Sequence, residues 1–316
     1  MKLIILLYLN LLLADFGGGY AGSGFRYASN AREFSLAGAL VADRTPGFFI
    51  FSNPSMVQSS KNNYLGISIQ NLALDRSIKS ISFSKKLPPN AGLGIAILQS
   101  TTNNIIGRDG MNKITEIFSA NELEGILSFG LAFNSNFSIG INIKAFFNSI
   151  YKNYNGNGIS SDLGFSYRLN RKLYFGAVIK NIKASYNWKI LLGEEERSYT
   201  ENFPIYYNFG ISYLPIKKIN IFFQQDIILL PNDFINYRTR LASEYKLKNK
   251  IMLRLGLKQL IGTNDSSNKV LNFTPTFGLG LPIQIWERKF IYLDYAIDPG
   301  IVGEGLSHLF SFSIKL

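Results

Sequence analysis

Hydrophobic and polar side chains alternate with a period of two along most of this chain. In one stretch, Ile139, Ile141 and Ile143 alternate with Gly140 and Asn142. Successive side chains of a β-strand point to opposite faces, so each such segment has one apolar face and one face of glycines, amides and charges. The pattern predicts about 14 strands, mostly of about 10–12 residues. These strands are residues 62–71, 76–86, 91–100, 122–133, 136–150, 158–169, 172–182, 204–214, 218–229, 236–247, 250–260, 271–281, 286–297 and 306–316.

The strand lengths and connections indicate a membrane barrel. Globular strands usually have about 5–6 residues, whereas a tilted strand needs about 9–11 to cross a membrane. Short and often basic connections, such as LNRK and LPIKK, alternate with longer polar ones, including residues 101–121 and 183–203. Short turns at one rim and long loops at the other are typical of transmembrane barrels. The predicted fold class is all-β, a transmembrane antiparallel β-barrel of about 14 strands with an N-terminal plug.

The last residues, LSHLFSFSIKL, fit the closing strand of such a barrel. Phe310, Phe312 and Ile314 lie on one face, and small or polar residues lie between them. Lipid does not tolerate an open sheet edge, so the final strand is expected to pair with the first. With an even number of strands, both termini are expected in the periplasm.

Residues 22–61 lack the alternation and are predicted to form the plug, because wide barrels otherwise enclose a channel. Asn30 is followed three residues later by Glu33, which is the spacing of a helix capping box. Two X-Pro steps further on, one of them Asn53-Pro54, predict turns. The barrel itself is assigned to residues 62–316.

The chain begins with a basic residue and an apolar run from Leu3 to Leu13. This run suits a signal peptide over residues 1–21 and is shorter than the about 20 residues of a spanning helix. Cleavage is expected after Ala14 or Ala21. Charged residues make up only 17% of the chain, compared with about 25% in soluble domains, which favours a membrane environment. Cysteine is absent, so disulfides and thiolate metal sites are excluded.

Several functional classes are disfavoured. The net charge is +12, but Lys and Arg are spread along strands and turns rather than gathered in one patch with stacking aromatics, so no nucleic-acid partner is expected. The only histidine, His308, falls on the outward phase near the rim with the longer loops. A histidine-dependent catalytic or metal site is therefore not expected. We predict no enzyme activity, no cofactor and no bound metal.

Charged residues of both signs fall on the inward, polar phase of the strands. They suggest either a salt-bridged interior that holds the plug or charges that face trapped water. The inward set comprises Asp162, Asp226, Arg238, Arg240, Glu244, Lys250, Arg254, Lys258 and Asp294. The predicted plug partners are Arg32, Glu33, Asp43, Arg44, Asn53 and Pro54.

Pro275 lies in the middle of a predicted strand, on the apolar phase with Phe273 and Phe277. Proline has no N–H to donate, and a closed barrel has no free edge on which to place it. The residue predicts either a β-bulge or a local opening in the wall through which an apolar ligand or a partner segment passes sideways.

Three stretches resemble a known family. They are AREFSLAGALVADRTPGFFIFSNPSM, SSDLGFSYRLNRKLYFGAVIKNI and YLDYAIDPGIVGEGLSHLFSFSIKL, in that order along the chain. Together they resemble the PorV/PorQ family. The resemblance implies a FadL-like barrel with an N-terminal plug in the outer membrane of a Gram-negative-type bacterium. It also implies association with type IX secretion, in which PorV-like members receive secreted cargo at the translocon. The chain departs from many barrels by ending in Leu316 rather than in an aromatic residue.

Two functional hypotheses follow. In the first, favoured by the resemblance, the barrel sits in outer-membrane lipid and binds the type IX translocon barrel, or cargo with a C-terminal signal domain, through its long loops. In the second, it is a FadL-like transporter of small hydrophobic molecules. Aromatic residues on the polar phase would suit such a ligand or would simply pack the lumen. They include Phe146, Tyr174, Tyr206, Phe222 and Tyr292.

Overall fold

The computed structural model describes residues 20–45, 47–60, 62–151, 154–192, 195–248, 250–259, 273–286, 289–298 and 306–316. Its helical elements are η1 (Ser23–Arg26), α2 (Ala31–Ser35), α3 (Phe49–Ser52) and η2 (Pro54–Ser59), where η denotes a 3₁₀-helix. Its strands are β1 (Tyr64–Asn71), β2 (Arg76–Leu87), β3 (Ala91–Arg108), β4 (Ile114–Ala132), β5 (Phe137–Tyr151), β6 (Tyr154–Arg168), β7 (Leu173–Ile182), β8 (Ser185–Leu192), β9 (Glu195–Asn202), β10 (Ile205–Ile216), β11 (Ile219–Leu229), β12 (Ile235–Lys246), β13 (Met252–Gln259), β14 (Phe273–Trp286), β15 (Lys289–Asp298) and β16 (Ser307–Lys315). The predicted leader, apart from Tyr20 and Ala21, lies outside the described residues. No helix in these ranges is long and apolar enough to cross a membrane.

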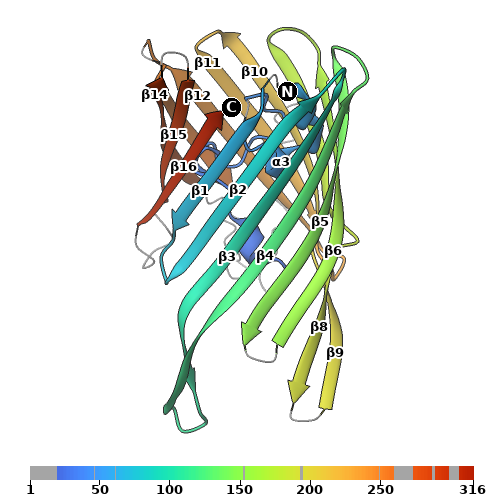
Figure 1. Cartoon of the computed structure of the whole chain (residues 1–316), viewed down its shortest axis with the longest axis vertical. Helices are drawn as coiled ribbons and strands as arrows, with labels where there is room; N and C mark the ends of the chain where they lie inside the picture. The colour runs from blue at the N-terminus through green and yellow to red at the C-terminus, as the bar shows by residue number, and fades with distance from the viewer. Residues whose placement is uncertain are drawn as a thin grey trace, which may run out of the picture.

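The strands form one antiparallel sheet that closes on itself (Figure 1). Pairing of β5 with β6 and of β1 with β16 completes the ring. Of the 16 strands, β8 and β9 form a hairpin that projects from the rim, so the closed barrel has 14 strands. The β1–β16 ladder runs without a register shift from Tyr64↔Lys315 to Asn71↔His308. The last strand therefore closes the barrel, as its alternation predicts.

Burial follows the predicted period of two. In β1, Ile67 and Ile69 are exposed, whereas Ser68 and Gln70 are buried. Apolar side chains thus form the outer surface and polar side chains the inner one, which is the reverse of a soluble sandwich. His308 is exposed on the outer face, as predicted.

The two ends of the barrel differ. The turns from β2 to β3, β4 to β5, β6 to β7, β10 to β11 and β12 to β13 are short and lie at one end, which we call the turn side (upper end in Figure 1). At the opposite end, the loop side, β3 and β4 continue past their neighbours as one long hairpin, and β8–β9 forms another (Figure 1).

The prediction that residues 101–121 and 183–203 are loops is wrong. Most of both stretches is extended and paired across the two hairpins, and the β3–β4 hairpin turns at Asp109–Lys113. Cross-strand backbone hydrogen bonds continue in both hairpins. In the β3–β4 hairpin beyond Thr102 no described strand residue up to Asn121 is buried, so the hydrophobic alternation that reveals strands in sequence is lost. In β8 the alternation is present, because Tyr186 and Trp188 are buried whereas Asn187 and Lys189 are exposed.

The wall is irregular at one place near the loop side. The β6–β7 ladder ends at the pair Ser161↔Ile182, and β6 pairs with β8 instead from Asn157↔Asn187 onward. Between these pairs, residues Gly158–Ser160 of β6 face the connection from β7 to β8. We call this place the β6–β8 break.

A β-bulge adjoins the break. Asn181 has φ of 64°, and its backbone N–H donates to Asp162 Oδ1 at 2.9 Å. On the returning path, Pro204 separates β9 from β10, where a proline cannot continue the ladder because it lacks an N–H.

The N-terminal segment, residues 20–60, lies inside the barrel (Figure 1). Near its middle, Phe49 and Ile50 are buried against Ile78 of β2, Leu98 of β3 and Ile126 of β4. Its α2 helix instead packs on β14, β15 and β16. The segment therefore contacts two separate parts of the wall from within, on either side of β1.

Local sequence explains the short helices of this segment. The side chain of Asn30 accepts a hydrogen bond from Glu33 N (2.9 Å), and Glu33 Oε2 accepts one from Ser29 N (2.8 Å). The predicted cap therefore forms, with the glutamate bonded one residue before the N-cap. At the second site, Asn53 caps η2 by accepting from Ser55 N at 3.1 Å, so the predicted turn at Asn53-Pro54 opens a 3₁₀-helix.

Candidate functional site

Arg32 joins the N-terminal segment to the wall through a buried ionic network. Its guanidinium lies 2.6 Å from Asp43 of the same segment and 3.2 Å from Glu244 of β12. Glu244 also bonds Arg254 (2.7 Å), which bonds Asp294 of β15 (2.7 Å). Burial alone would lower the pKa of Arg32, but the charges of Asp43 and Glu244 outweigh burial and raise it. Arg32 therefore stays cationic.

A second ionic cluster holds the chain just after α2. Asp226 of β11, which is fully buried, lies 2.9 Å from Arg238 and 2.7 Å from Arg240 of β12. Arg240 Nη1 also donates to the carbonyl of Gly38 at 2.9 Å. Gly38 has φ of 72°, a conformation that suits glycine and turns the chain away from the helix.

A third cluster lies on the facing strands. Lys144 of β5 bonds Glu124 of β4 (2.7 Å) and Asp162 of β6 (3.3 Å), and all three are buried. The neighbouring Asn142 donates to Asp162 (3.0 Å) and to the carbonyl of Ile50 in α3 (2.9 Å). Sequence reasoning missed the role of Lys144 and Glu124. Their shared inward phase was readable, but the register that brings them together was not.

Asn53 and Pro54 seat the segment on the wall. The Asn53 amide donates to the carbonyl of Val41 (2.8 Å) and to that of Phe165 in β6 (3.0 Å). Pro54 lies against Gly140 and Gly164, where an added Cβ would overlap it. These glycines let the backbone of the segment approach the strands closely.

The predicted plug contacts divide into four groups. Arg32, Asn53, Pro54, Arg240 and Arg254 connect the segment with the wall, either directly or through the Arg32 network. Asp43 is linked to the wall through its ion pair with Arg32, and Arg238 is linked to the segment through its ion pair with Asp226. The hydrogen bonds of Glu33 that the described structure shows stay within the segment, at Ser29. Arg44 lies over the ring of Tyr174 of β7, 4.8 Å from its centroid.

Aromatic side chains form an apolar chamber on the inner wall toward the loop side. We define this aromatic chamber as the wall residues Phe146, Tyr186, Trp188 and Phe203, against which Phe25 of η1 packs. Phe146 stacks on Phe203 (4.7 Å between centroids) and on Phe25 (5.8 Å). Tyr186 lies 4.8 Å from Phe203 and 5.3 Å from Trp188.

The start of the described segment fills this chamber. Ala21 is buried within it, and a Cβ at Gly22 would overlap the ring of Phe203. Of the aromatic residues predicted on the inward phase, Phe146 belongs to the chamber. Phe222 instead packs under Leu36 and Leu40.

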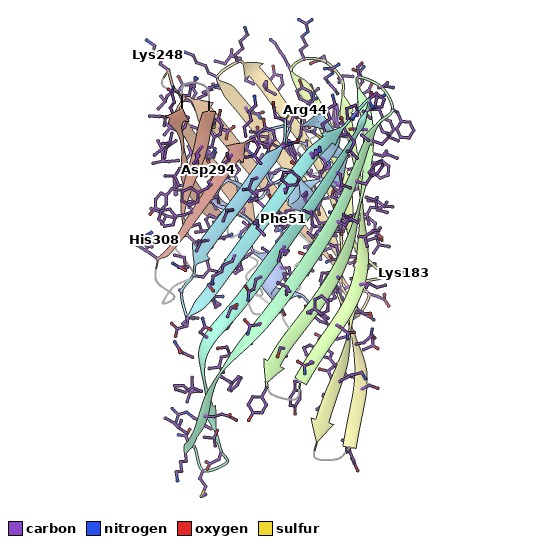
Figure 2. All side chains as sticks on the ribbon, viewed as in Figure 1. Arg44, Phe51, Lys183, Lys248, Asp294 and His308 are labelled. Carbon is purple, nitrogen blue, oxygen red and sulfur yellow. The ribbon has the colours of Figure 1, made fainter. Side chains whose placement is uncertain are left out.

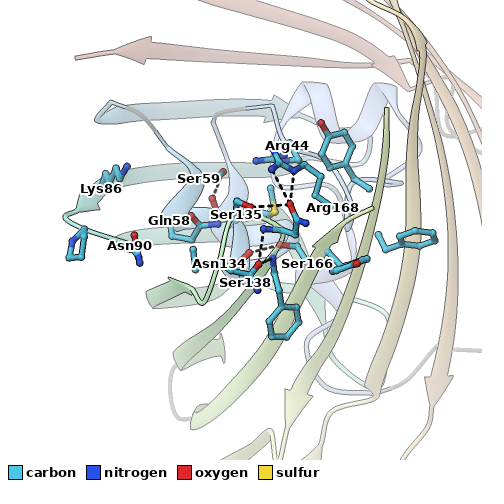
Figure 3. Close-up of a pocket in the computed structure, with 18 residues that line it drawn as sticks. Arg44, Gln58, Ser59, Lys86, Asn90, Asn134, Ser135, Ser138, Ser166 and Arg168 are labelled. Atoms are coloured by element: carbon cyan, nitrogen blue, oxygen red, sulfur yellow. Dashed lines mark hydrogen bonds between the residues drawn. The ribbon is translucent and has the colours of Figure 1, made fainter. Parts of the chain in front are cut away.

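The turn-side mouth holds two adjoining cavities, one of about 430 Å³ (Figure 3) and one of about 520 Å³. Both are lined by Arg44, Ser59 and Tyr174. Lys86 and Arg168 line the first cavity, and Lys315 lines the second.

Pro275 occupies an outward position in β14 and pairs with Leu257 of β13. That ladder is regular from Met252↔Gly280 to Gln259↔Phe273, so no bulge appears on this side. On the other side, the described pairing of β14 with β15 begins at Phe277. The strand ends beside Pro275 lie outside the described residues, and the predicted opening stays a prediction.

Comparison with known proteins places the fold. No family model and no curated protein matches this chain. Among solved structures, the toluene transporter TodX of Pseudomonas putida has a TM-score of 0.61 at 12% identity, over 92% of this chain and 98% of that chain. The monoaromatic hydrocarbon channel CymD has a TM-score of 0.60 at 14% identity, over 90% and 96%.

A FadL homologue of Pseudomonas aeruginosa is similar too, with a TM-score of 0.58 at 10% identity, over 90% of this chain and 97% of that chain. These identities are too low to transfer an activity, and the likeness concerns the fold. Nothing in the comparisons singles out PorV or PorQ. The chain therefore has the fold of the FadL-like barrels of the outer membrane.

Proposed function

We propose that this protein is an outer-membrane channel for small hydrophobic molecules, with the N-terminal segment as its plug. The observation that carries the proposal is the aromatic chamber. Ionic and aliphatic side chains hold the segment at other parts of the inner wall, but here a cluster of aromatic rings faces the lumen. Binding sites for apolar ligands are lined mainly by apolar and aromatic side chains.

The chamber is occupied by the protein's own chain, which suggests how a ligand binds. Only two apolar side chains of the segment, Ala21 and Phe25, pack in this cluster among the described residues, and a small hydrophobic molecule can take their place. Stacking of Phe25 on Phe146 is the contact that such a ligand would take over. Aromatic pairs of this kind contribute about 0.5–1.5 kcal/mol each in addition to the burial of their area, and a ligand that stacks on Phe146 would replace both contributions.

The β6–β8 break is the proposed exit into the membrane. It adjoins the chamber, because Gly158 of β6 lies near both the Phe146 ring and the Ser185 carbonyl. In this structure the break is sealed, since an added Cβ on Gly158 would overlap that carbonyl. Residues in the break lack the regular ladder on the β7 side, so a small movement of the β7–β8 connection would open it.

In this proposal the turn side, where the C-terminal strand ends, faces the periplasm, and a periplasmic N-terminus stays a prediction. The support for this orientation is the difference in connection length, since barrels have short periplasmic turns and longer extracellular extensions. A cysteine replacing Lys248, which lies at the turn-side rim (Figure 2), tests this. The chain has no other cysteine. An impermeant maleimide should label Lys248→Cys only after the outer membrane is permeabilised, and labelling of intact cells would reverse the orientation.

Trp188 provides a direct test of the chamber. The chain has two tryptophans, and Trp188 is one of the chamber rings. In lipid nanodiscs, toluene or a medium-chain fatty acid should quench Trp188 emission saturably. Trp188→Phe should remove that saturable change and leave Trp286, which serves as the control emitter. Equal quenching in both proteins would mean that the molecules dissolve in lipid rather than bind in the chamber.

A disulfide staple tests the exit. Asn157 and Asn187 are cross-strand partners on the outer face beside the break. With both changed to cysteine, oxidation should lower uptake of a radiolabelled hydrophobe by cells that lack their own channel of this kind, and reduction should restore uptake. The same staple at Ile221 and Ser243, partners in an unbroken ladder, should have no effect. Equal uptake in all states would exclude exit at the break.

The type IX secretion hypothesis draws no support from the comparisons. Binding of a translocon barrel or of cargo with a C-terminal signal domain stays a prediction. The long β3–β4 hairpin is the surface that would serve it.

A further inference from the structure

Positive charge is concentrated at the turn side of the barrel. The cations of the turns and of the mouth are exposed, apart from the half-buried Arg168. They are Arg44, Lys85, Lys86, Arg168, Arg171, Lys172, Lys217, Lys218, Lys246, Lys248, Lys250 and Lys315. The described residues of these turns include no Asp or Glu. The connections at the loop side differ, because they carry Asp75, Asp109, Glu195 and Asp233. The excess of positive over negative charge is therefore found at the turn side.

Most of these cations do not point toward lipid. By strand phase, Lys86, Arg168, Lys246 and Lys315 lie on the inward face, since Ser84, Ser166, Ala242 and Ser311 are on that face and buried or half-buried. Lys218 and Lys248 are exposed at turn tips, and Lys248 lies at the turn-side end of the barrel (Figure 2). Of the strand cations named above, Lys85 lies on the outward face. An arrangement built for lipid head groups would place its cations outward.

The mouth that these cations surround is hollow. Its two cavities adjoin through shared lining residues, including Arg44. Asn and Ser side chains, including Asn134, Asn136 and Ser138, supply further hydrogen-bonding groups in the first cavity. Asp43 lines the second cavity, but its negative charge is balanced by Arg32. The net charge around the mouth therefore remains positive.

We propose that the turn-side mouth is a docking surface for an acidic face of a soluble periplasmic protein. Charge complementarity is the argument: a ring of cations with no carboxylate among its described turns attracts a partner of opposite sign and repels basic ones. The two cavities offer concave sites for acidic side chains, with Lys86 and Arg168 lining the first and Lys315 the second. The proposal rests on the proposed function only in placing this mouth in the periplasm.

The test uses purified protein in nanodiscs of zwitterionic lipid at low salt, where the screening length is long. The probe is a short fluorescein-labelled peptide of alternating Glu and Ser, followed by fluorescence anisotropy. A matching peptide of Lys and Ser is the negative probe. The mouth variant combines Lys86→Gln, Arg168→Gln and Lys315→Gln. The control removes the same charge at the loop side, with Arg108→Gln, Lys113→Gln and Arg197→Gln.

The mouth variant should bind the acidic peptide about tenfold more weakly, because each exposed ion pair contributes a few-fold. The control variant should bind like the parent, and raised salt should weaken binding to the parent. Equal loss in both variants, or equal binding of the Lys-Ser peptide, would overturn the proposal. So would an unchanged acidic-peptide affinity in a mouth variant that retains the gel mobility of the folded barrel.

Anionic lipid is the competing occupant. Co-purification of phosphatidylglycerol with the parent and its loss from the mouth variant, with peptide binding unchanged, would assign the cations to lipid and refute protein docking. None of these measurements requires transport. Failure of the docking proposal is thus separable from failure of the channel proposal, which the Trp188 and staple experiments address.

Discussion

Replacing Arg32 with glutamate should loosen the N-terminal segment and open the barrel to ions. In the native protein Arg32 compensates Asp43 at 2.6 Å and Glu244 at 3.2 Å. The change removes both ion pairs and adds a third carboxylate among them. Breaking a buried pair by removing one partner costs about 3–5 kcal/mol. Because Glu244 keeps Arg254 as a partner, we expect the lower end, about 3 kcal/mol.

An energy of about 3 kcal/mol changes the ratio of docked to displaced segment by more than about a hundredfold. In planar bilayers the parent should therefore be closed for nearly all of the recording, and Arg32→Glu should show frequent open events. Arg44→Glu is the matched control. It makes the same charge change in the same segment, but Arg44 only lies over Tyr174 in the open mouth, so its trace should resemble that of the parent.

A conductance trace of Arg32→Glu identical to that of the parent would refute the reasoning. A double-mutant cycle separates the wall contact from general destabilisation. Arg32→Gln and Glu244→Gln should show a coupling of about 1–3 kcal/mol in thermal unfolding, as contacting residues do. Additive effects would mean that the Arg32–Glu244 contact does not hold the segment.

Three further predictions concern single positions. Lys144→Met leaves Glu124 and Asp162 as buried, uncompensated carboxylates, and should lower the unfolding free energy by about 3–5 kcal/mol in denaturant titrations; a loss below about 1 kcal/mol would show that water replaces the lysine. Gly140→Val should displace η2, because its side chain would overlap the segment backbone, and should raise conductance without preventing barrel assembly; an unaltered closed trace would count against close seating. Pro275→Val should leave hydrophobe uptake unchanged if exit occurs at the β6–β8 break, whereas a severalfold fall would establish the wall opening at Pro275.

Strand prediction worked where a strand has one lipid-facing side. Ile67 and Ile69 alternate with Ser68 and Gln70 in the sequence, and the structure places them on opposite faces. It failed in the β3–β4 hairpin beyond Thr102, where the residues are extended but neither face is buried in lipid. There the backbone hydrogen bonds alone maintain the strand, and they leave no pattern in the side chains.

The alternation predicted which side chains face the interior, but it did not predict which of them pair with one another. Inward charges at Asp226, Arg238 and Arg240 were recognised, and they do cluster. Glu33, however, bonds its own helix start rather than the wall, because the capping position competes for its carboxylate. Lys144 and Glu124 were overlooked because a pairing between strands depends on the register of β4 against β5.

The sequence by itself determined that this chain forms long amphipathic strands, that its apolar faces point outward and that its last strand closes a barrel. Those features follow from the two-residue alternation of apolar and polar side chains and from the rule that a sheet in a membrane leaves no open edge exposed to lipid. Only the tertiary structure decided which charges meet across the lumen, where the aromatic chamber lies and where the wall breaks. These depend on strand register and on the path of the N-terminal segment, which bring together residues such as Arg32 and Glu244 that are far apart in the chain.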